Sequence, residues 1–165
     1  MSTMKRWSLR IALGLVAVLI VIQLIPVQRE NPPEHNTATM TPAVEAVLRQ
    51  SCYDCHSNQT VWPWYSAVAP MSWIVADHVE EGREELNFSN WDSFSAKKKA
   101  HIADESLEEI EDGEMPLWDY ELAHGDAKLS PEDVTVLKDW MTTLAAAAPA
   151  GGEDEHGEHG EHDHD

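Results

Sequence analysis

The sequence predicts an all-α domain of about 100 residues between a basic, apolar N-terminal segment and a tail rich in histidine and acidic residues. Two observations predict this fold class. Apolar residues recur at helical spacing in four stretches between residues 41 and 146. Helix start and stop signals bound these stretches: Thr-Pro at 41–42, Gly at 113 and Ser-Pro at 130–131.

The chain is strongly acidic, with a formal net charge of −19. Residues 1–29 hold four basic and no acidic residues, so the rest of the chain carries 7 basic against 30 acidic residues. Nucleic acid needs Lys and Arg to contact its phosphates. This composition therefore argues against nucleic-acid binding and favours a repelling, well-solvated surface or a basic partner.

Residues 1–29 have the pattern of a signal peptide or a membrane anchor. Three basic residues precede an apolar run from Ile11 to Val27. No Ala-x-Ala-like cleavage site follows this run, so we expect an uncleaved transmembrane anchor helix with its basic end in the cytoplasm. Residues 30–40 indicate a linker. The domain over 41–146 is then expected outside the cytoplasmic (inner) membrane, in the periplasm where the cell has one.

The first helix of the domain is predicted to begin at Pro42, with Thr41 as its N-cap, and it runs directly into Cys52-Tyr53-Asp54-Cys55-His56. Cys-x-x-Cys-His is the attachment signature of c-type haem. Two thiols at this spacing can each bond one vinyl-derived carbon of a porphyrin, and the histidine beside them can bind the iron. We therefore expect one covalent haem c per chain, held by Cys52, Cys55 and His56.

A dithiol redox pair and half of a zinc site are the alternatives for the two cysteines. Cys52 and Cys55 are the only cysteines of the chain, so no second pair exists to complete a zinc site. A thioredoxin-like site would have strand and helix patterns around it, and none is found.

A second helix is predicted to begin near Pro70, after a segment with several tryptophans that either wall a haem pocket or belong to an ordinary core. Its apolar stripe contains Met71 and His78, opposite an acidic face. Imidazole and thioether both bind haem iron, so His78 and Met71 are weaker candidates for the second iron ligand. Packing inside the domain is the alternative for each.

The stronger candidate for the second iron ligand is Met115. A third helix is predicted over 96–112 with Gly113 as its C-terminal cap, and Met115 follows directly. Pro116 disfavours a helical backbone at Met115, so its thioether should project from an extended loop. Met115 comes 59 residues after His56, far enough to reach the other porphyrin face. A buried loop methionine is the alternative.

The last helix is predicted over 131–145, begun by Ser130-Pro131. His124, in the loop before it, either bonds a haem propionate or is a solvated loop histidine. Residues 147–165 should be disordered, because nothing in them can form a core. This tail either solvates the protein or binds Zn²⁺, Ni²⁺ or Cu²⁺ loosely. Its histidines are His156, His159, His162 and His164.

Several short motifs together resemble one family. They are Cys52-Tyr53-Asp54-Cys55-His56-Ser57-Asn58, Pro63-Trp64-Tyr65-Ser66, Ala69-Pro70, Ser72-Trp73, Glu81-Gly82-Arg83 and Gly113-Glu114-Met115-Pro116-Leu117, with Tyr120, His124 and Leu129-Ser130. They resemble the bacterial haem-binding domain family of small exported proteins, over roughly residues 41–142. The resemblance implies haem binding and no defined reaction.

The order of helix, attachment motif and Met-Pro loop is similar to the class I cytochrome c plan. That similarity implies a last helix packed across the first one, around a single haem.

The predicted function is electron transfer by a membrane-anchored cytochrome. With His56 and Met115 on the iron, no position remains for oxygen or peroxide, which favours an electron carrier over an enzyme. The expected partners are redox proteins and the cytoplasmic membrane. The alternatives are a haem-based sensor or haem enzyme with an open or labile distal site, and a metal-handling protein that acts through its histidine-rich tail.

Overall fold

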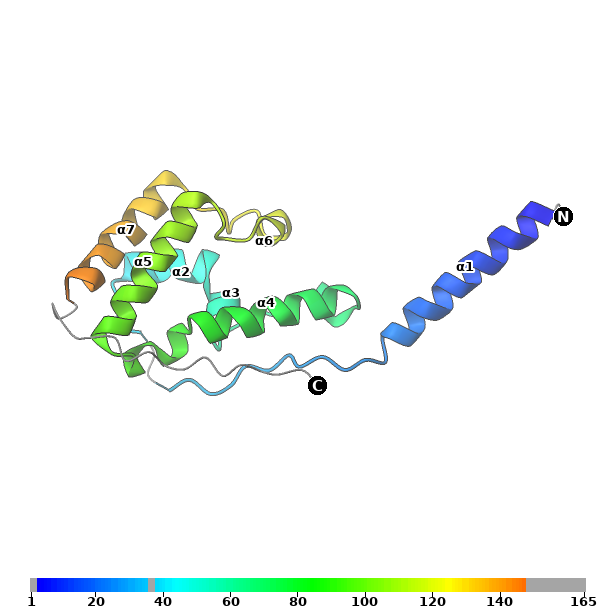
Figure 1. The fold of residues 1–165 in the computed structure, drawn as a ribbon, viewed down its shortest axis with the longest axis horizontal. Coiled ribbons are helices and arrows are strands. Elements are labelled where there is room, and N and C mark those ends of the chain that lie inside the picture. The colour runs from blue at the N-terminus through cyan, green and yellow to red at the C-terminus, as the bar shows by residue number, and fades with distance from the viewer. Residues whose placement is uncertain (1–2, 36–37, 148–165) are drawn as a thin grey trace, which may run out of the picture.

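Figure 1 shows the fold in a computed structural model, which describes residues 3–35 and 38–147. Over these residues the chain forms seven α-helices and two short 3₁₀ helices, and no strand. The predicted all-α class is therefore confirmed. The elements are α1 (Thr3–Ile22), α2 (Pro42–Ser51), α3 (Tyr53–His56), η1 (Trp64–Ala67), α4 (Met71–Glu85), η2 (Phe88–Ser93), α5 (Ala96–Asp112), α6 (Trp118–Ala123) and α7 (Pro131–Ala146).

The helix ends follow the local signals of the sequence. The Thr41 side chain accepts the backbone N–H of Val44 at the start of α2. Ser130 and Asp133 form a capping box at the start of α7. Gly113 ends α5 with a φ of 76°, a left-handed conformation that glycine adopts at low cost. These three predicted boundaries are confirmed.

The core lies between α2, α5 and α7. The last helix packs along α5 and also against α2 (Figure 1). The contact with α2 agrees with what the resemblance to class I cytochromes implied, whereas the contact with α5 was not predicted. Leu137 of α7 is completely buried and Met141 nearly so. The basic start and acidic end of α5 oppose its macrodipole, so packing against α7 has to stabilise this helix. Buried core residues are Val44, Val47, Leu48, Tyr53, Phe88, Trp91, Ile102, Ala103, Leu137 and Met141.

The predicted transmembrane anchor is not found. No helix among the described residues is both long enough and apolar enough to cross a membrane. Helix α1 does form and projects away from the domain (Figure 1), but it ends at Ile22, before the end of the apolar run. Its first half also contains Lys5, Arg6 and Arg10. The uncharged part, 11–22, is shorter than the roughly 20 residues that a membrane-spanning helix needs.

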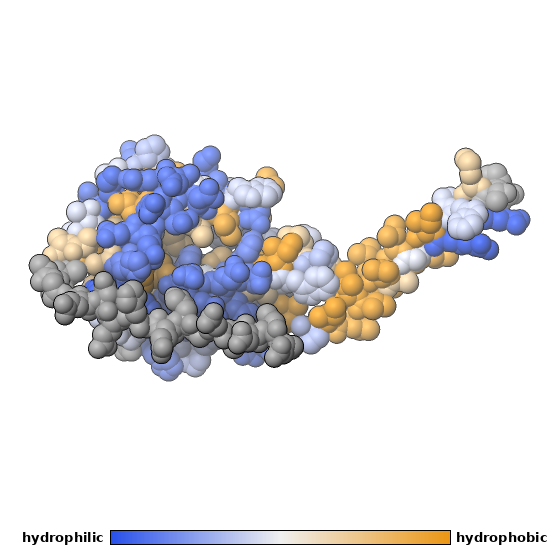
Figure 2. All heavy atoms as spheres, viewed as in Figure 1, coloured by the Kyte–Doolittle hydropathy of each residue, from blue (hydrophilic) through white to orange (hydrophobic). Residues whose placement is uncertain are grey.

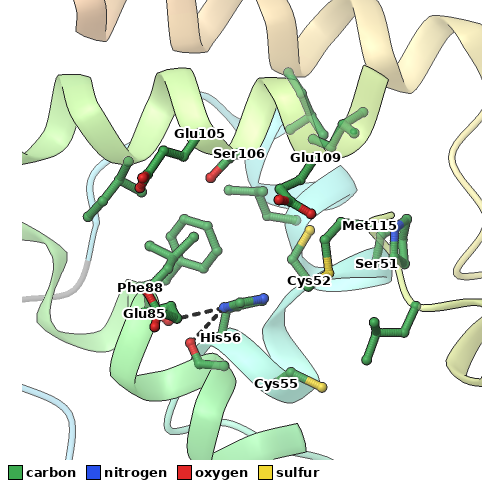
Figure 3. Close-up of a pocket in the computed structure, with 18 of the residues that line it drawn as sticks. Ser51, Cys52, Cys55, His56, Glu85, Phe88, Glu105, Ser106, Glu109 and Met115 are labelled. Atoms are coloured by element: carbon green, nitrogen blue, oxygen red, sulfur yellow. Dashed lines mark hydrogen bonds between the residues drawn. The ribbon is translucent and has the colours of Figure 1, made fainter. Parts of the chain in front are cut away.

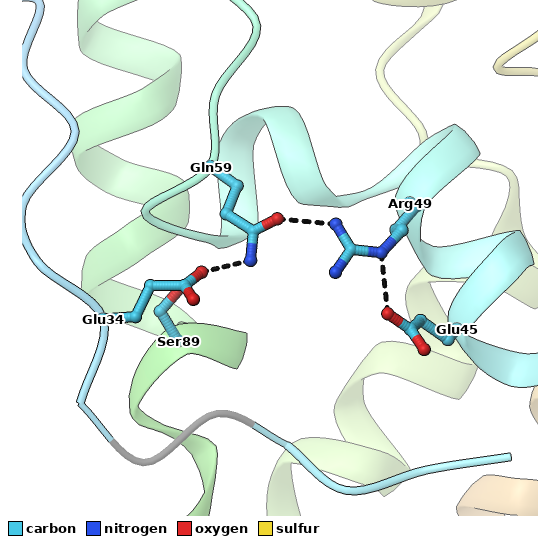
Figure 4. A network of polar contacts seen from close by, with 5 residues as sticks. All are labelled: Glu34, Glu45, Arg49, Gln59 and Ser89. Atoms are coloured by element: carbon cyan, nitrogen blue, oxygen red, sulfur yellow. Dashed lines mark hydrogen bonds and ion pairs between the residues drawn. The ribbon is translucent and has the colours of Figure 1, made fainter. Parts of the chain in front are cut away.

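The stretch predicted as a linker contacts the domain through residues 30–35. The carboxylate of Glu34 accepts a hydrogen bond from the Gln59 amide. The Gln59 oxygen in turn accepts from Arg49 at 2.6 Å, and Arg49 also pairs with Glu45 at 2.8 Å (Figure 4). The Ser89 hydroxyl donates to the same Glu34 carboxylate. Residues 30–35 thus lie along the domain beside the turn that follows His56.

Candidate functional site

The domain contains a cavity of about 490 Å³ that is bounded by α2, α3, α4, α5, α7 and the segment after α5 that includes α6. This volume lies within the range of small-molecule and cofactor sites. Cys52, Cys55, His56 and Met115 all line it (Figure 3). The structure thus brings the attachment motif and the Met-Pro loop to one cavity. The apolar lining residues are Leu48, Leu86, Phe88, Ile102, Ile110, Leu117, Leu129, Leu137 and Met141.

His56 is held in one orientation by the backbone of α4. Its Nδ1–H donates to the carbonyl oxygens of Gly82 at 2.7 Å and Leu86 at 3.2 Å (Figure 3). Since carbonyls only accept hydrogen bonds, the proton is on Nδ1, and the Nε2 lone pair is left on the cavity side of the ring. Burial lowers the pKa of His56 and so favours the neutral ring that binds metal.

Gly82 allows α4 to approach the attachment motif closely. A Cβ atom at this position would lie 3.0 Å from the Cys55 carbonyl oxygen and 3.1 Å from the Cys55 Cβ. Those distances are too short for an unstrained side chain, so only glycine fits here without movement. The same helix turn supplies the Gly82 carbonyl to His56. A glycine inside a helix costs about 1 kcal/mol relative to alanine, and this contact is the packing reason for it.

The two cysteines are half-buried and their thiols are not activated. Burial raises the pKa of Cys52 to about 12 and that of Cys55 to about 11. Both are free cysteines. A reactive dithiol has a thiolate with a lowered pKa, so these values argue against thiol–disulfide chemistry. Among the residues that the structure describes, no group of three or more His, Cys, Asp or Glu side chains could hold a metal ion.

Met115 reaches the cavity from the loop after α5. The Gly113 cap ends the helix, and the N–H groups of Glu114 and Met115 both donate to the Glu109 carbonyl, at 2.9 and 3.1 Å. Met115 is half-buried and outside helical structure, as predicted. Its segment follows α5, whereas His56 belongs to α3 and is supported by α4, so the two residues come from different walls.

The family of the chain was identified by comparison with models of known protein families. A family model described as the haem-binding domain matches residues 17–143. The chain belongs to this family. The match starts within α1 and so reaches beyond the roughly 41–142 that the motifs covered. Comparisons with curated proteins and with solved structures gave no match.

The residues of this haem-binding domain fit the group that its family binds. The walls are apolar, two thiols and an imidazole nitrogen line one side, and a thioether lines another. The Ser51 hydroxyl also lines the cavity, is buried, and has no hydrogen-bond partner, so a group in the cavity could supply one. Cys52, Cys55, His56 and Met115 are the residues that would hold a haem.

The weaker candidates lie in different places. His78 lines the same cavity, but from α4, the helix whose carbonyls hold His56. Met71 and His124 do not line it; both line a neighbouring cavity of about 80 Å³. His124 contacts Tyr120 and Tyr65 there. The tail histidines, and the predicted disorder and metal binding of that tail, lie outside the described residues.

Three features of the site were not predicted from the sequence. Tyr120 lines both cavities and bonds to Asp54 of the attachment motif. Ser51 has its unpartnered hydroxyl. Four glutamates of α4 and α5 also line the larger cavity: Glu81, Glu85, Glu105 and Glu109. The acidic residues of each helix were visible in the sequence. No short-range sequence signal indicated that glutamates of both helices line one cavity.

Proposed function

We propose that this haem-binding domain is a c-type cytochrome that carries single electrons, with one haem bonded to Cys52 and Cys55 and its iron between His56 and Met115. The observation that supports this proposal most is the shared cavity. His56 and Met115 are 59 residues apart in the sequence, yet both line one apolar cavity together with the only two cysteines.

Each of these residues has a distinct role in the proposal. A bound haem supplies an iron that takes up and releases one electron. His56 offers a neutral imidazole whose orientation is set by the Gly82 carbonyl. Met115 would hold the iron together with His56, and a methionine there would raise the reduction potential relative to a second histidine. The lining is mostly apolar and so limits the water around the cofactor, which lowers the solvent reorganisation when the charge changes.

The proposed redox partner is a basic protein. Glu81, Glu85, Glu105 and Glu109 line the cavity, and all four are exposed. No Lys or Arg is among the described residues that line this cavity. A partner with Lys and Arg around its own redox centre would therefore be attracted to this side of the domain, at a rate that falls with rising salt concentration.

We propose that the domain lies outside the cytoplasmic membrane and stays attached to it. Apolar side chains of α1 are exposed along the helix (Figure 2), and such a surface is stable only in apolar surroundings. The Gln23 side chain ties the end of this segment to the domain. Its amide donates to the Ala69 carbonyl at 3.2 Å, and its oxygen accepts the Ala69 N–H at 2.9 Å.

Membrane attachment is tested by fractionation of cells that make the full chain. The protein should remain in the membrane fraction after washes with high salt and with alkaline carbonate. Release by either wash would contradict attachment through apolar contacts.

The haem proposal is tested by the absorption spectra of the wild type and Met115→Ala, made in cells with a c-haem maturation system. The wild type should retain its haem through acidified acetone and show a low-spin spectrum with a far-red sulfur-to-iron band. That band should be absent in Met115→Ala. If the wild type lacks the band, Met115 is not the ligand; a low-spin iron would then point to His78. A high-spin iron would instead favour a haem-based sensor or enzyme.

A further inference from the structure

The segment that carries Met115 packs weakly against the rest of the domain. Helix α6, which begins three residues after Met115, contains no buried residue. Trp118 and Leu122 of this helix are 76% and 79% exposed. Apolar burial therefore contributes little to the position of Met115. Specific polar contacts have to hold the segment over the cavity instead.

One of these polar contacts ends on the attachment motif itself. The hydroxyl of Tyr120, five residues after Met115, donates to Asp54 Oδ2 at 2.9 Å. Asp54 lies between the two cysteines, two residues before His56. The bond therefore joins the two segments that carry the proposed iron ligands, although its residues are 66 positions apart.

Both partners of this bond are held in place by other groups. Asp54 Oδ1 accepts the backbone N–H of Val61 at 2.9 Å, and the Asp54 carbonyl accepts the Thr60 hydroxyl at 2.7 Å. The ring of His124 lies 4.3 Å from that of Tyr120, and its Nδ1–H donates to the Tyr120 carbonyl at 3.2 Å. The hydrogen bond thus has a fixed acceptor and an oriented donor, which is the arrangement of a positioning contact.

We propose that the Tyr120–Asp54 hydrogen bond is a latch that keeps Met115 in the cavity and sets how readily an external ligand replaces it. This inference rests on the proposed function, because it assumes that Met115 binds the iron. Tyr120 and Asp54 are positioning residues. Without their bond, the Met115 segment remains tied to the domain by the end of α5 and by the bond from Gln50 to the Asp126 carbonyl.

The test is imidazole binding to the ferric, haem-loaded full chain, followed by the loss of the far-red sulfur-to-iron band. Tyr120→Phe removes the hydroxyl and keeps the ring. We expect it to bind imidazole about tenfold more tightly than the wild type, because the hydrogen bond to the carboxylate no longer opposes the displacement of Met115. A factor of ten corresponds to about 1.4 kcal/mol. Its haem content and its band without imidazole should match the wild type.

Tyr65→Phe is the matched control. Its hydroxyl contacts His124 Nε2 at 3.4 Å beside the same small cavity, but it does not bond to Asp54. Imidazole affinity should stay within about twofold of the wild type in this variant, since only one long neutral bond is lost. Asp54→Asn keeps an oxygen for the Val61 N–H but offers Tyr120 only a neutral NH2 group, which donates to the hydroxyl, so its imidazole affinity should fall between those of the wild type and Tyr120→Phe. Asp54→Ala should resemble Tyr120→Phe.

The outcomes separate the latch from the proposed function. Equal imidazole affinity in Tyr120→Phe and the wild type, with the far-red band present in both, would overturn the latch alone. An equal increase of imidazole affinity in Tyr120→Phe and Tyr65→Phe would show that any substitution in this region has the effect, and would also overturn the latch. A wild type without the band would overturn Met115 ligation itself. If Tyr120→Phe does not take up haem, the test is amide hydrogen exchange in the two variants. The latch requires that the amides of residues 114–123 exchange faster in Tyr120→Phe than in Tyr65→Phe.

Discussion

His56 and Met115 line the same cavity, but the two sides of that cavity are built differently. On the His56 side, the backbone carbonyls of Gly82 in α4 and of its C-cap Leu86 hold the imidazole. Helix α4 approaches the attachment motif so closely that only glycine fits at position 82 without movement of its neighbours. On the Met115 side, the segment after α5 has almost no buried side chains and is tied down by hydrogen bonds such as Tyr120–Asp54.

This difference predicts where the domain resists change. Close packing of backbone on backbone leaves no room for adjustment, so substitutions on the His56 side should destabilise the whole domain. A segment held by a few polar contacts opens at lower free energy than the core. Substitutions on the Met115 side should therefore affect iron ligation and ligand exchange more than global stability.

The largest effect is expected for Arg83→Gln, on the His56 side. Arg83 donates to the carbonyls of Ser57 and Glu30 and to the side chains of Asn31 and Thr60, at 2.8 to 3.0 Å. Because Ser57 is fully buried, its carbonyl loses a partner that water cannot replace. We expect the free energy of unfolding in urea to fall by about 3 kcal/mol.

Arg49→Gln is the control for this measurement. Arg49 is largely exposed where it pairs with Glu45, donates to Gln59 and lies over the Tyr53 ring. Exposed contacts of this kind contribute little, so the loss should not exceed about 1 kcal/mol. Similar losses for the two arginine variants would contradict the special role of the His56 side.

The second prediction concerns Gly82→Ala. A methyl group at this position would meet the Cys55 carbonyl oxygen at 3.0 Å, and a backbone atom cannot turn aside. Strain of this kind costs about 3 kcal/mol, and the better helix propensity of alanine offsets about 1 kcal/mol. We therefore expect a net loss of about 2 kcal/mol in urea unfolding. Gly125→Ala, with open space around it, should be within about 0.5 kcal/mol of the wild type.

The third prediction tests the Met115 side through pH. Burial and the nearby Asp54 raise the pKa of Tyr120 above its usual value of 10.0. A raised tyrosine pKa means that the stabilisation is complete below pH 10 and is lost as the pH rises further, since the unfolded chain loses its proton first. Tyr120→Phe should cost about 1.5 kcal/mol at pH 8, because the bond lost is to a carboxylate. Between pH 10 and 11, the free energy of unfolding in urea should fall faster with pH for the wild type than for the variant. The same pH dependence in both proteins would contradict the raised pKa of Tyr120.

The smallest effect is expected for Gln50→Ala. The Gln50 amide donates to the Asp126 carbonyl at 2.6 Å and ties the far end of the Met115 segment to α2. The contact is exposed, so water replaces it easily, and we expect a loss of no more than about 0.5 kcal/mol in urea unfolding. A loss near that of Gly82→Ala would show that the Met115 side is as firmly built as the His56 side.

Much of the fold follows from local chemistry and was predicted. Thr41, Gly113 and Ser130 mark helix ends because each acts on backbone groups a few residues away. The elements missed were short ones, such as α6 and the two 3₁₀ helices, which carry no apolar period long enough to recognise. The predicted membrane-spanning helix was not found among the described residues, because α1 ends at Ile22 and its first half contains three basic residues.

The sequence by itself determined the chemistry available to this protein: two thiols and an imidazole at haem-attachment spacing, and a thioether on a Met-Pro loop. Spacing and helix ends are local properties, so they can be read along the chain. Only the tertiary structure decided that Met115 shares a cavity with His56, that Gly82 touches Cys55, and that Tyr120 bonds to Asp54. These contacts join residues from 27 to 66 positions apart, and they exist only because the helices pack at particular angles and distances.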